Sequence, residues 1–185
     1  MATLVLLNGP PASGKSTIAA RLVGGRPLAL NLDIDVIRSL LGDWKARPPE
    51  AGVAARRLAL AMSREHLGSG RDVIVPQFLA RAEFIDQLAE SADSIGARFV
   101  EIALMISRAD AVAAFERRSA QPESAAHRDA FEAVTEAGGV AALTAMHDNY
   151  MDRMQRRTSA RRVEVTIDDI DGTVASVESA ISALP

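Results

Sequence analysis

The sequence predicts an α/β fold built on a parallel β-sheet with helices on both faces, and three observations support this. Short apolar runs recur along the 185 residues, at 4–7, 28–32, 73–75, 99–106 and 163–167. Segments with apolar residues at three- and four-residue spacing separate these runs, which is the period of a helix. The runs are nearly unbroken in their apolar character, as is typical of strands buried on both sides. Strands that alternate with helices are joined by right-handed crossovers into a parallel sheet.

The segments between the apolar runs predict the helices of the fold. Their expected ranges are 15–23, 36–41, 49–67, 82–91, 109–119, 139–156 and 173–184. Two polar segments, 42–52 and 117–131, fit the alternation poorly. Long excursions of this kind in compact domains often form lids or binding segments. Because the sequence shows no internal repeat and no linker, we expect residues 1–185 to form a single domain.

Composition excludes several classes of protein. A formal net charge of −3 argues against a broad nucleic-acid or membrane-surface footprint. The absence of cysteine rules out disulfides and thiolate metal sites. No apolar stretch reaches the roughly 18 residues of a membrane span, and the run at 4–7 is too short for a signal peptide. We therefore expect a cytoplasmic protein, a monomer or homodimer, with a small-molecule partner.

The strongest functional signal is the stretch GPPASGKS, which satisfies the phosphate-binding pattern G-x-x-x-x-G-K-[ST]. Glycines allow such a loop to point its backbone N–H groups at an anion, and the helix that follows adds its positive N-terminal end. Lys15, one of only two lysines, is expected to reach the β- and γ-phosphates, and the Ser16 hydroxyl to ligate Mg²⁺. The cofactors expected are therefore ATP and Mg²⁺, with the nucleotide bound by Gly9, Ala12, Ser13, Gly14, Lys15, Ser16 and Thr17.

A second signal is LDIDVIR, which carries Asp33, Asp35 and Arg38 directly after the second apolar run. Parallel strands end at one edge of a sheet, so this segment is expected beside the phosphate loop. If the chain is still extended there, the two carboxylates project to one side and can share a Mg²⁺-and-phosphate site. If a helix begins near Asp35, then Asp35 and Arg38 share a helical face instead. An aspartate that only caps the helix is the third interpretation.

Residues 3–41 resemble the small P-loop kinases in the order of their elements and motifs. They contain an expected strand, the stretch GPPASGKST, an expected helix, a second strand and the pattern D-x-D…R. LDID is similar to the D-x-D of shikimate-kinase-like enzymes. DVIR is similar to the D-x-x-R of the AAA-type, zeta-toxin, chloramphenicol-phosphotransferase-like and polynucleotide-kinase-like enzymes. The resemblance implies that Asp35 is the base or acceptor orienter, that Asp33 lies on the magnesium side, and that Arg38 binds the acceptor. It also implies a three-layer P-loop NTPase fold with five parallel strands in the order 2-3-1-4-5.

The same resemblance implies a lid after the fourth strand, at about 119–128, and an acceptor-binding excursion at about 42–66. Arg117 and Arg118 match the place where such kinases keep arginines that bind ATP, and we expect Arg118 to be the catalytic member of the pair. Arginine suits this role because its planar guanidinium bonds two phosphate oxygens at once or stacks on adenine.

The sequence departs from these kinases after the third strand, where PQF stands in place of the usual Asp or Asn. Because the usual carboxylate is absent there, we expect Asp33 to be the carboxylate that contacts the metal. Gln77 becomes a candidate for contact with the acceptor. Trp44 is a further acceptor candidate, and Arg56 a weaker one. A basic run of five arginines between 153 and 162 is most simply a set of solvated helix ends.

The function expected from these residues is transfer of the γ-phosphoryl group of ATP to the hydroxyl of a small molecule, an alcohol phosphotransferase reaction. Two alternatives stay open. A nucleotide-dependent regulatory ATPase would share the phosphate loop, although the N-K-x-D pattern of guanine-nucleotide switches is absent from the sequence. A polynucleotide 5′-kinase would share D-x-x-R, but nucleic acid is an improbable partner for an acidic chain with 4% aromatic residues.

Overall fold

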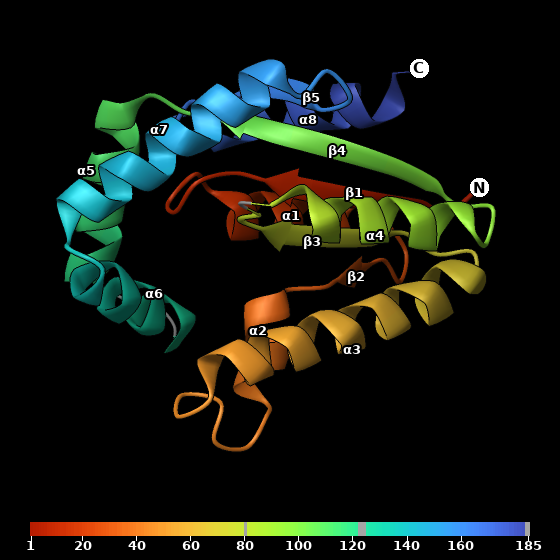
Figure 1. Cartoon of the computed structure of the whole chain (residues 1–185). Helices are drawn as coiled ribbons and strands as arrows, with labels where there is room; N and C mark the ends of the chain where they lie inside the picture. The colour runs from red at the N-terminus through yellow and green to blue at the C-terminus, as the bar shows by residue number, and fades with distance from the viewer. Residues whose placement is uncertain (80, 122–124, 184–185) are drawn as a thin grey trace.

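The computed structural model describes residues 1–79, 81–121 and 125–183, and its helices and strands alternate along the chain (Figure 1). The strands are β1 (Thr3–Asn8), β2 (Leu30–Asn31), β3 (Val73–Gln77), β4 (Arg98–Met105) and β5 (Arg161–Glu164). The helices are α1 (Lys15–Gly24), α2 (Ile34–Ser39), α3 (Pro48–Gly68), α4 (Ala82–Asp93), α5 (Arg108–Ala120), α6 (Ala125–Glu136), α7 (Val140–Arg156) and α8 (Ile170–Ser182).

The strands form a five-stranded parallel sheet in the order β2-β3-β1-β4-β5, which confirms the predicted strand order. Alternate residues of β1 pack on opposite faces. Leu4 and Leu6 belong to a core with α2, α3 and α4, whereas Val5 and Leu7 belong to a core with α1 and α8. Helices therefore cover both faces, and the architecture is the P-loop NTPase fold.

Several boundaries differ from those predicted. β2 is shorter than the apolar run at 28–32, because Leu28 has φ 56° and turns the chain before the strand begins. β5 starts at Arg161, two residues before the apolar run at 163–167, and ends at Glu164. α2 starts at Ile34 because the side chain of Asp33 caps it.

The polar segment 117–131 was predicted as an excursion with helical fragments, and the structure divides it between two regular helices. Arg117 and Arg118 lie in the last turn of α5, and α6 follows. Phe115 of α5, Val134 of α6 and Leu143 of α7 share a small buried core, which joins these three helices. Phe115 and Phe131 also stack, with ring centroids 6.2 Å apart. Part of the segment expected as a lid, 122–124, lies outside the described residues.

The carboxyl end of β1 is fixed by side chains from distant parts of the chain. Asn8 is fully buried, and its side-chain oxygen accepts a hydrogen bond from the backbone N–H of Leu79 at 3.1 Å. Its carbonyl oxygen accepts a hydrogen bond from the Tyr150 hydroxyl at 2.7 Å. Gln77 lies opposite Asn8 in the register of β1 and β3. The segments that follow β1 and β3 therefore start side by side.

The basic run between 153 and 162 has structural partners. Arg157 donates to Glu101, a buried carboxylate of β4 that needs a counter-charge. Arg162 donates to the carbonyls of Met154 and Gln155 at the end of α7, and Arg161 donates to carbonyls near the end of α8. Arg161 and Arg162 therefore bond to carbonyls at helix ends. Arg157 instead is the counter-charge of a buried carboxylate, which the prediction of solvated helix ends did not include. In the part of the chain that is described, no helix has the length and apolar character to cross a membrane.

Candidate active site

The loop between β1 and α1 has a backbone that only small residues tolerate. A Cβ atom at Gly9 would collide with the Ser13 hydroxyl and lie 3.1 Å from the Cβ of Leu104. Gly14 has φ 80° and stands at the N-cap of α1, where among the described residues no side chain bonds the free N–H groups. Ala12 also has a positive φ, 64°, at a cost of about 1–2 kcal/mol for a non-glycine residue. The loop thus leaves the start of α1 open to an anion.

Lys15 folds back over this loop. Its ammonium donates hydrogen bonds to the carbonyl oxygens of Gly9 and Pro10, at 2.9 and 2.8 Å. Burial, together with the positive charge of Arg118, lowers the pKa of Lys15 to about 7, against a smaller opposing effect of Asp35. Burial is the larger of these two causes, and the carboxylates of Asp35 and Asp33 offset it only in part.

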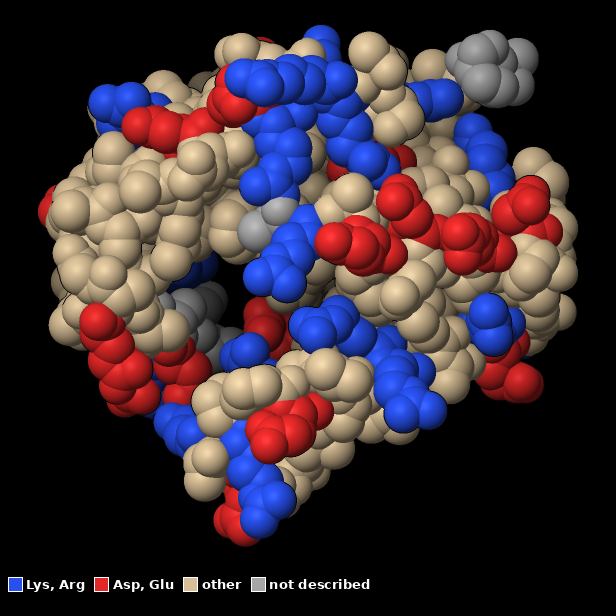
Figure 2. Space-filling model, in the orientation of Figure 1, with Lys and Arg blue, Asp and Glu red and all other residues tan. Residues whose placement is uncertain are grey.

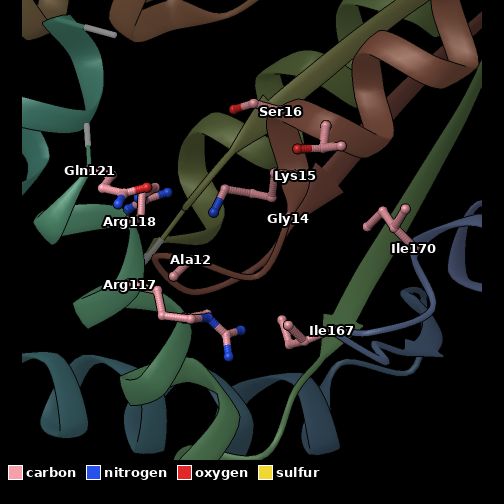
Figure 3. A pocket seen from close by; sticks show the side chains of 11 residues that line it. Ala12, Gly14, Lys15, Ser16, Arg117, Arg118, Gln121, Ile167 and Ile170 are labelled. Atoms are coloured by element: carbon pink, nitrogen blue, oxygen red, sulfur yellow. The ribbon is translucent and has the colours of Figure 1, made fainter. Parts of the chain in front are cut away.

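A cavity of about 460 Å³ opens beside the loop (Figure 3). Figure 3 shows Ile167 and Ile170 on the opposite side of this cavity from Arg118 and Gln121. Burial lowers the pKa of Arg118. The wall contains three cationic side chains and no carboxylate among the described residues; its members are Ala12, Gly14, Lys15, Ser16, Thr17, Ala114, Arg117, Arg118, Gln121, Ile167 and Ile170.

Of the residues predicted to bind the nucleotide, Gly9 and Ser13 are absent from this wall, and the apolar part of the wall was not predicted. The predicted residues that do line it are Ala12, Gly14, Lys15, Ser16, Thr17, Arg117 and Arg118. Ile167 belongs to the run at 163–167, which predicts a strand. Because β5 ends at Glu164, Ile167 lies in the connection to α8, beside Ile170. Ala114 and Gln121 carry no pattern that marks them as lining residues.

Asp33 and Asp35 have separate roles at the start of α2. The side chain of Asp33 accepts hydrogen bonds from the backbone N–H groups of Asp35 and Val36, at 2.9 and 3.4 Å, so it is the N-cap. Burial, and then the charge of Asp35, raises the pKa of Asp33. Asp35 lies within the helix and pairs with Arg38 at 3.1 Å. The interpretation with a helix that brings Asp35 and Arg38 together is therefore correct. The helix cap is also present, at Asp33, whereas the chain is not extended as far as Asp35.

A second, smaller pocket of about 100 Å³ lies between α2, α3 and the segment after β3. The Nε2 group of Gln77 donates to the carboxylate of Asp35 at 3.3 Å. The pocket is lined by Ile34, Asp35, Arg38, Gly52, Ala55, Arg56, Gln77, Phe78 and Leu79. Trp44 is outside this wall, and its ring centre lies 5.0 Å from the Arg38 guanidinium carbon and 5.4 Å from the Lys45 ammonium.

The two pockets are neighbours although they share no lining residue. Asp35 lines the smaller pocket, yet its charge raises the pKa of Lys15 in the larger one. In Figure 2, basic side chains lie above, to the right of and below a hollow on the visible face of the molecule, and acidic side chains lie at its lower left. Among the described residues no cluster of three or more histidine, aspartate or glutamate side chains could hold a metal ion by itself.

Comparison with protein families decides the classification of the chain. A family model described as an AAA domain matches residues 4–138, which include the phosphate loop, Asp35 and both α5 arginines. The chain belongs to this AAA domain family. None of the curated proteins matches it.

Solved structures share the fold of this AAA domain at low sequence identity. A proposed kinase from Chloroflexus aurantiacus has a TM-score of 0.65 and 18% identity, over 97% of this chain and 96% of its own. A gluconokinase from Sinorhizobium meliloti has a TM-score of 0.58 and 17% identity, over 97% and 94% of the two chains. The tunicamycin resistance protein of Deinococcus radiodurans has a TM-score of 0.58 and 13% identity, over 100% of both. The AAA domain therefore has a kinase-like P-loop fold.

The larger cavity of the AAA domain fits a nucleoside triphosphate. A polyphosphate would supply the negative charge that Lys15, Arg117 and Arg118 lack, and the apolar pair of Ile167 and Ile170 suits a flat base. Mg²⁺ binds in proteins through one or two carboxylates together with phosphate oxygens. Asp33 is in the wall of neither pocket, but its charge acts on Lys15 of the larger one. The Ser16 hydroxyl and the Asp33 carboxylate, whose pKa is raised, are oxygen ligands of the required kind.

Proposed function

We propose that this protein is a kinase that transfers the γ-phosphoryl group of ATP to the hydroxyl of a small molecule. The observation that carries the proposal is the position of Asp35, which lines the smaller pocket while its charge acts on Lys15 in the larger one. A carboxylate between an acceptor pocket and a phosphate cavity is the arrangement that phosphoryl transfer requires. The fold shared with a gluconokinase and a proposed kinase supports the same reaction.

The larger cavity binds the nucleotide in this proposal. The backbone amides of residues 9–17 surround the phosphates, and Lys15 exchanges its two carbonyl partners for the β- and γ-phosphate oxygens. Arg118 lies near Lys15 and stabilises the charge that builds on the transferred group. Arg117 and the Ile167–Ile170 pair hold the base and ribose end.

Magnesium, when bound, neutralises charge on the β- and γ-phosphates. In this chain Ser16 and Asp33 would hold it. Burial, and then the charge of Asp35, raises the pKa of Asp33, and a divalent cation at this carboxylate would oppose both effects. The side-chain oxygen Oδ1 of Asp33 is engaged in the cap of α2, so the metal role falls to Oδ2.

The smaller pocket binds the acceptor with its hydroxyl at Asp35. The hydroxyl oxygen forms a bond to the γ-phosphorus while the bond from that phosphorus to the β–γ bridging oxygen breaks, and ADP leaves. The hydroxyl proton passes to the Asp35 carboxylate. Gln77 and Arg38 orient this carboxylate through contacts of 3.3 and 3.1 Å. Correct orientation of the reacting groups then supplies most of the acceleration of phosphoryl transfer.

The proposal is tested by incubating the protein with Mg·ATP and a panel of hydroxyl-bearing metabolites and antibiotics. ADP formation and the mass of a phosphorylated product are measured together. We expect one acceptor class to yield product, and expect Lys15→Ala to lower turnover by a factor of about 100 or more. Lys45→Ala, which removes the only other lysine, is the matched control. ATP consumption that never yields a phosphorylated product would contradict the proposal and favour a regulatory ATPase.

A further inference from the structure

We propose that the acceptor of this kinase is a small hydroxy carboxylic acid, and that Arg56 together with Arg38 binds its carboxylate. The inference rests on the proposed function for the identity of the reaction, but the binding that it predicts does not require turnover. It adds Arg56, and selection for an acid over an uncharged alcohol, to the acceptor site.

The charge balance of the smaller pocket favours an anion. Its wall carries one carboxylate, Asp35, and two guanidinium groups, Arg38 and Arg56. Asp35 pairs with Arg38 at 3.1 Å, and among the described residues Arg56 has no carboxylate partner within ion-pairing distance. The pocket therefore has one uncompensated positive charge. One carboxylate on the ligand would balance it, whereas a phosphate dianion would leave an excess of negative charge beside Asp35.

Two polar atoms of the pocket lack a hydrogen-bond partner, and they require partners of different kinds. Nε of Arg38 and Oε1 of Gln77 are buried atoms with no hydrogen-bond partner in the described structure. The orientation of the Gln77 amide is determined, because its nitrogen donates to the Asp35 carboxylate, which only accepts. Its oxygen is therefore an acceptor aimed at a donor, such as an alcohol hydroxyl. The Arg38 nitrogen is a donor that requires an acceptor, such as a carboxylate oxygen.

Arg56 is held where it can complete this site. The backbone of α3 is fixed by a stripe of buried small residues, Ala51, Ala55 and Ala59, against the sheet. The Arg56 guanidinium carbon lies 6.0 Å from the centre of the Phe84 ring, and one of its nitrogens lies close to Gly52, 3.6 Å from where a Cβ would stand. Stacking on an aromatic ring leaves the edge of a guanidinium free for a bidentate bond to a carboxylate.

The volume of the pocket limits the ligand to a small molecule. At about 100 Å³ the closed space holds a few water-sized groups, enough for a carboxylate and a short hydroxyl-bearing chain. A buried polar atom without a partner is costly, so a ligand that satisfies both Arg38 and Gln77 is preferred over an alcohol that satisfies Gln77 alone.

The fluorescence of Trp44 reports binding without ATP. It is the only tryptophan in the chain, and its ring stacks on Arg38, so a carboxylate that binds Arg38 changes its emission. The probes are hydroxy acids of three to seven carbons, such as D-glycerate and D-gluconate. Each is paired with its uncharged polyol, glycerol or sorbitol, and glycerol 3-phosphate represents phosphorylated acceptors. We expect at least one acid to bind at least tenfold more tightly than its polyol and than glycerol 3-phosphate.

Arg56→Gln is the test variant, and Arg57→Gln, an exposed neighbour on the same helix, is its matched control. Both should give the same circular dichroism spectrum as the unmodified protein. We expect Arg56→Gln to raise the dissociation constant of the acid tenfold or more and to leave that of the polyol unchanged, and Arg57→Gln to alter neither. Equal binding of acid and polyol, tighter binding of glycerol 3-phosphate, no binding of any acid, or an unchanged constant in Arg56→Gln would each overturn the inference.

The same panel with Mg·ATP separates this inference from the proposed function. Acids that bind through Arg56 but are never phosphorylated would overturn the kinase proposal and support the anion site. Phosphorylation of an uncharged polyol as fast as its acid, unaffected by Arg56→Gln, would support the kinase proposal and overturn the anion site.

Discussion

The two pockets of this AAA domain are built in contrasting ways. The larger cavity takes most of its wall from two short stretches, 12–17 of the phosphate loop and 114–121 of α5 and the residue after it, and Ile167 and Ile170 complete it. The smaller pocket is assembled from α2, from α3 and from the end of β3, segments that are far apart in the sequence. The difference teaches that a contiguous motif marks the larger cavity in the sequence, whereas the smaller pocket can be recognised only in the folded chain.

The electrostatics of the two pockets also differ. In the larger cavity the cations have no carboxylate in the wall, and the pKa of Lys15 falls to about 7. In the smaller pocket Asp35 already pairs with Arg38 and accepts from Gln77. This contrast is the basis of the two proposals above, a polyphosphate for the larger cavity and a hydroxy acid for the smaller pocket.

The largest effect on turnover is expected from substitution of Asp35, which would sharpen the comparison of the two pockets. Asp35→Asn removes the proton acceptor at the acceptor hydroxyl, so we expect the turnover number to fall by a factor of about 10²–10⁴ while ATP affinity stays within a few-fold. Steady-state kinetics with the best acceptor, and equilibrium titration with ATP, measure the two quantities separately.

Asp33→Asn is the variant to compare with Asp35→Asn, because it tests the magnesium role of Asp33. Asparagine caps a helix as well as aspartate does, so the fold and the thermal midpoint should be preserved. We expect the Mg²⁺ concentration required for half-maximal activity to rise, with a smaller loss of turnover at saturating Mg²⁺. Turnover that survives Asp35→Asn and disappears in Asp33→Asn at saturating Mg²⁺ would reverse the two assignments.

The phosphate loop and the sheet could be predicted from sequence because their signals are local. Lys15 and Ser16 belong to a motif of eight consecutive residues, and apolar runs at 4–7 and 73–75 mark strands without knowledge of their partners. The start of α2 was left between alternatives, because the pattern LDID is compatible with a strand or a cap. Only the two hydrogen bonds accepted by Asp33 decide it.

A second, intermediate effect concerns the pH dependence of ATP binding. The pKa of Lys15 is about 7 in the free protein, and adjacent phosphates would raise it. Below pH 7 the ammonium is already present, so affinity is at its maximum. Above pH 7 binding must take up a proton, and the dissociation constant should rise by up to tenfold per pH unit.

Calorimetric titrations with Mg·ATP between pH 6 and 9, in buffers of different ionisation enthalpy, measure both the affinity and the proton uptake. Lys15→Ala should bind weakly, with a pH dependence that reflects only the nucleotide. If this variant kept the full pH dependence of the unmodified protein, the proton would belong to another group.

The smallest effect is expected at the ion pairs that join the acceptor side to α6. Lys45 lies 2.6 Å from a carboxylate oxygen of Asp129 and 3.6 Å from one of Glu132. Lys45 and Glu132 are exposed and Asp129 is half-buried. Ion pairs near the surface are weak and screened by salt. We expect Lys45→Ala to change the Michaelis constant of the acceptor by a few-fold at most, with the difference vanishing at high salt. A loss of turnover as large as that in Lys15→Ala would show that Lys45 takes part in the chemistry.

Other parts of the site could not be predicted because their signals are distributed. Ile167 lies in an apolar run that is typical of a strand, and only the end of β5 at Glu164 makes it a wall of the cavity. Asn8 carries no motif, yet contacts to Tyr150 and Leu79 make it the anchor of the phosphate loop. Arg56 is one of two adjacent arginines on α3. The sequence offered it only as a weaker acceptor candidate, and the packing of the helix places it in the wall of the pocket.

The most direct test of the account is a crystal structure with Mg²⁺, a non-hydrolysable ATP analogue and the best-binding hydroxy acid. The account predicts that the γ-phosphate contacts the Lys15 ammonium, and that the acid lies in the smaller pocket. Its hydroxyl would then lie between Asp35 and that phosphate, and its carboxylate against Arg56. An analogue bound away from the larger cavity, or an acid whose hydroxyl lies beyond reach of Asp35, would contradict it.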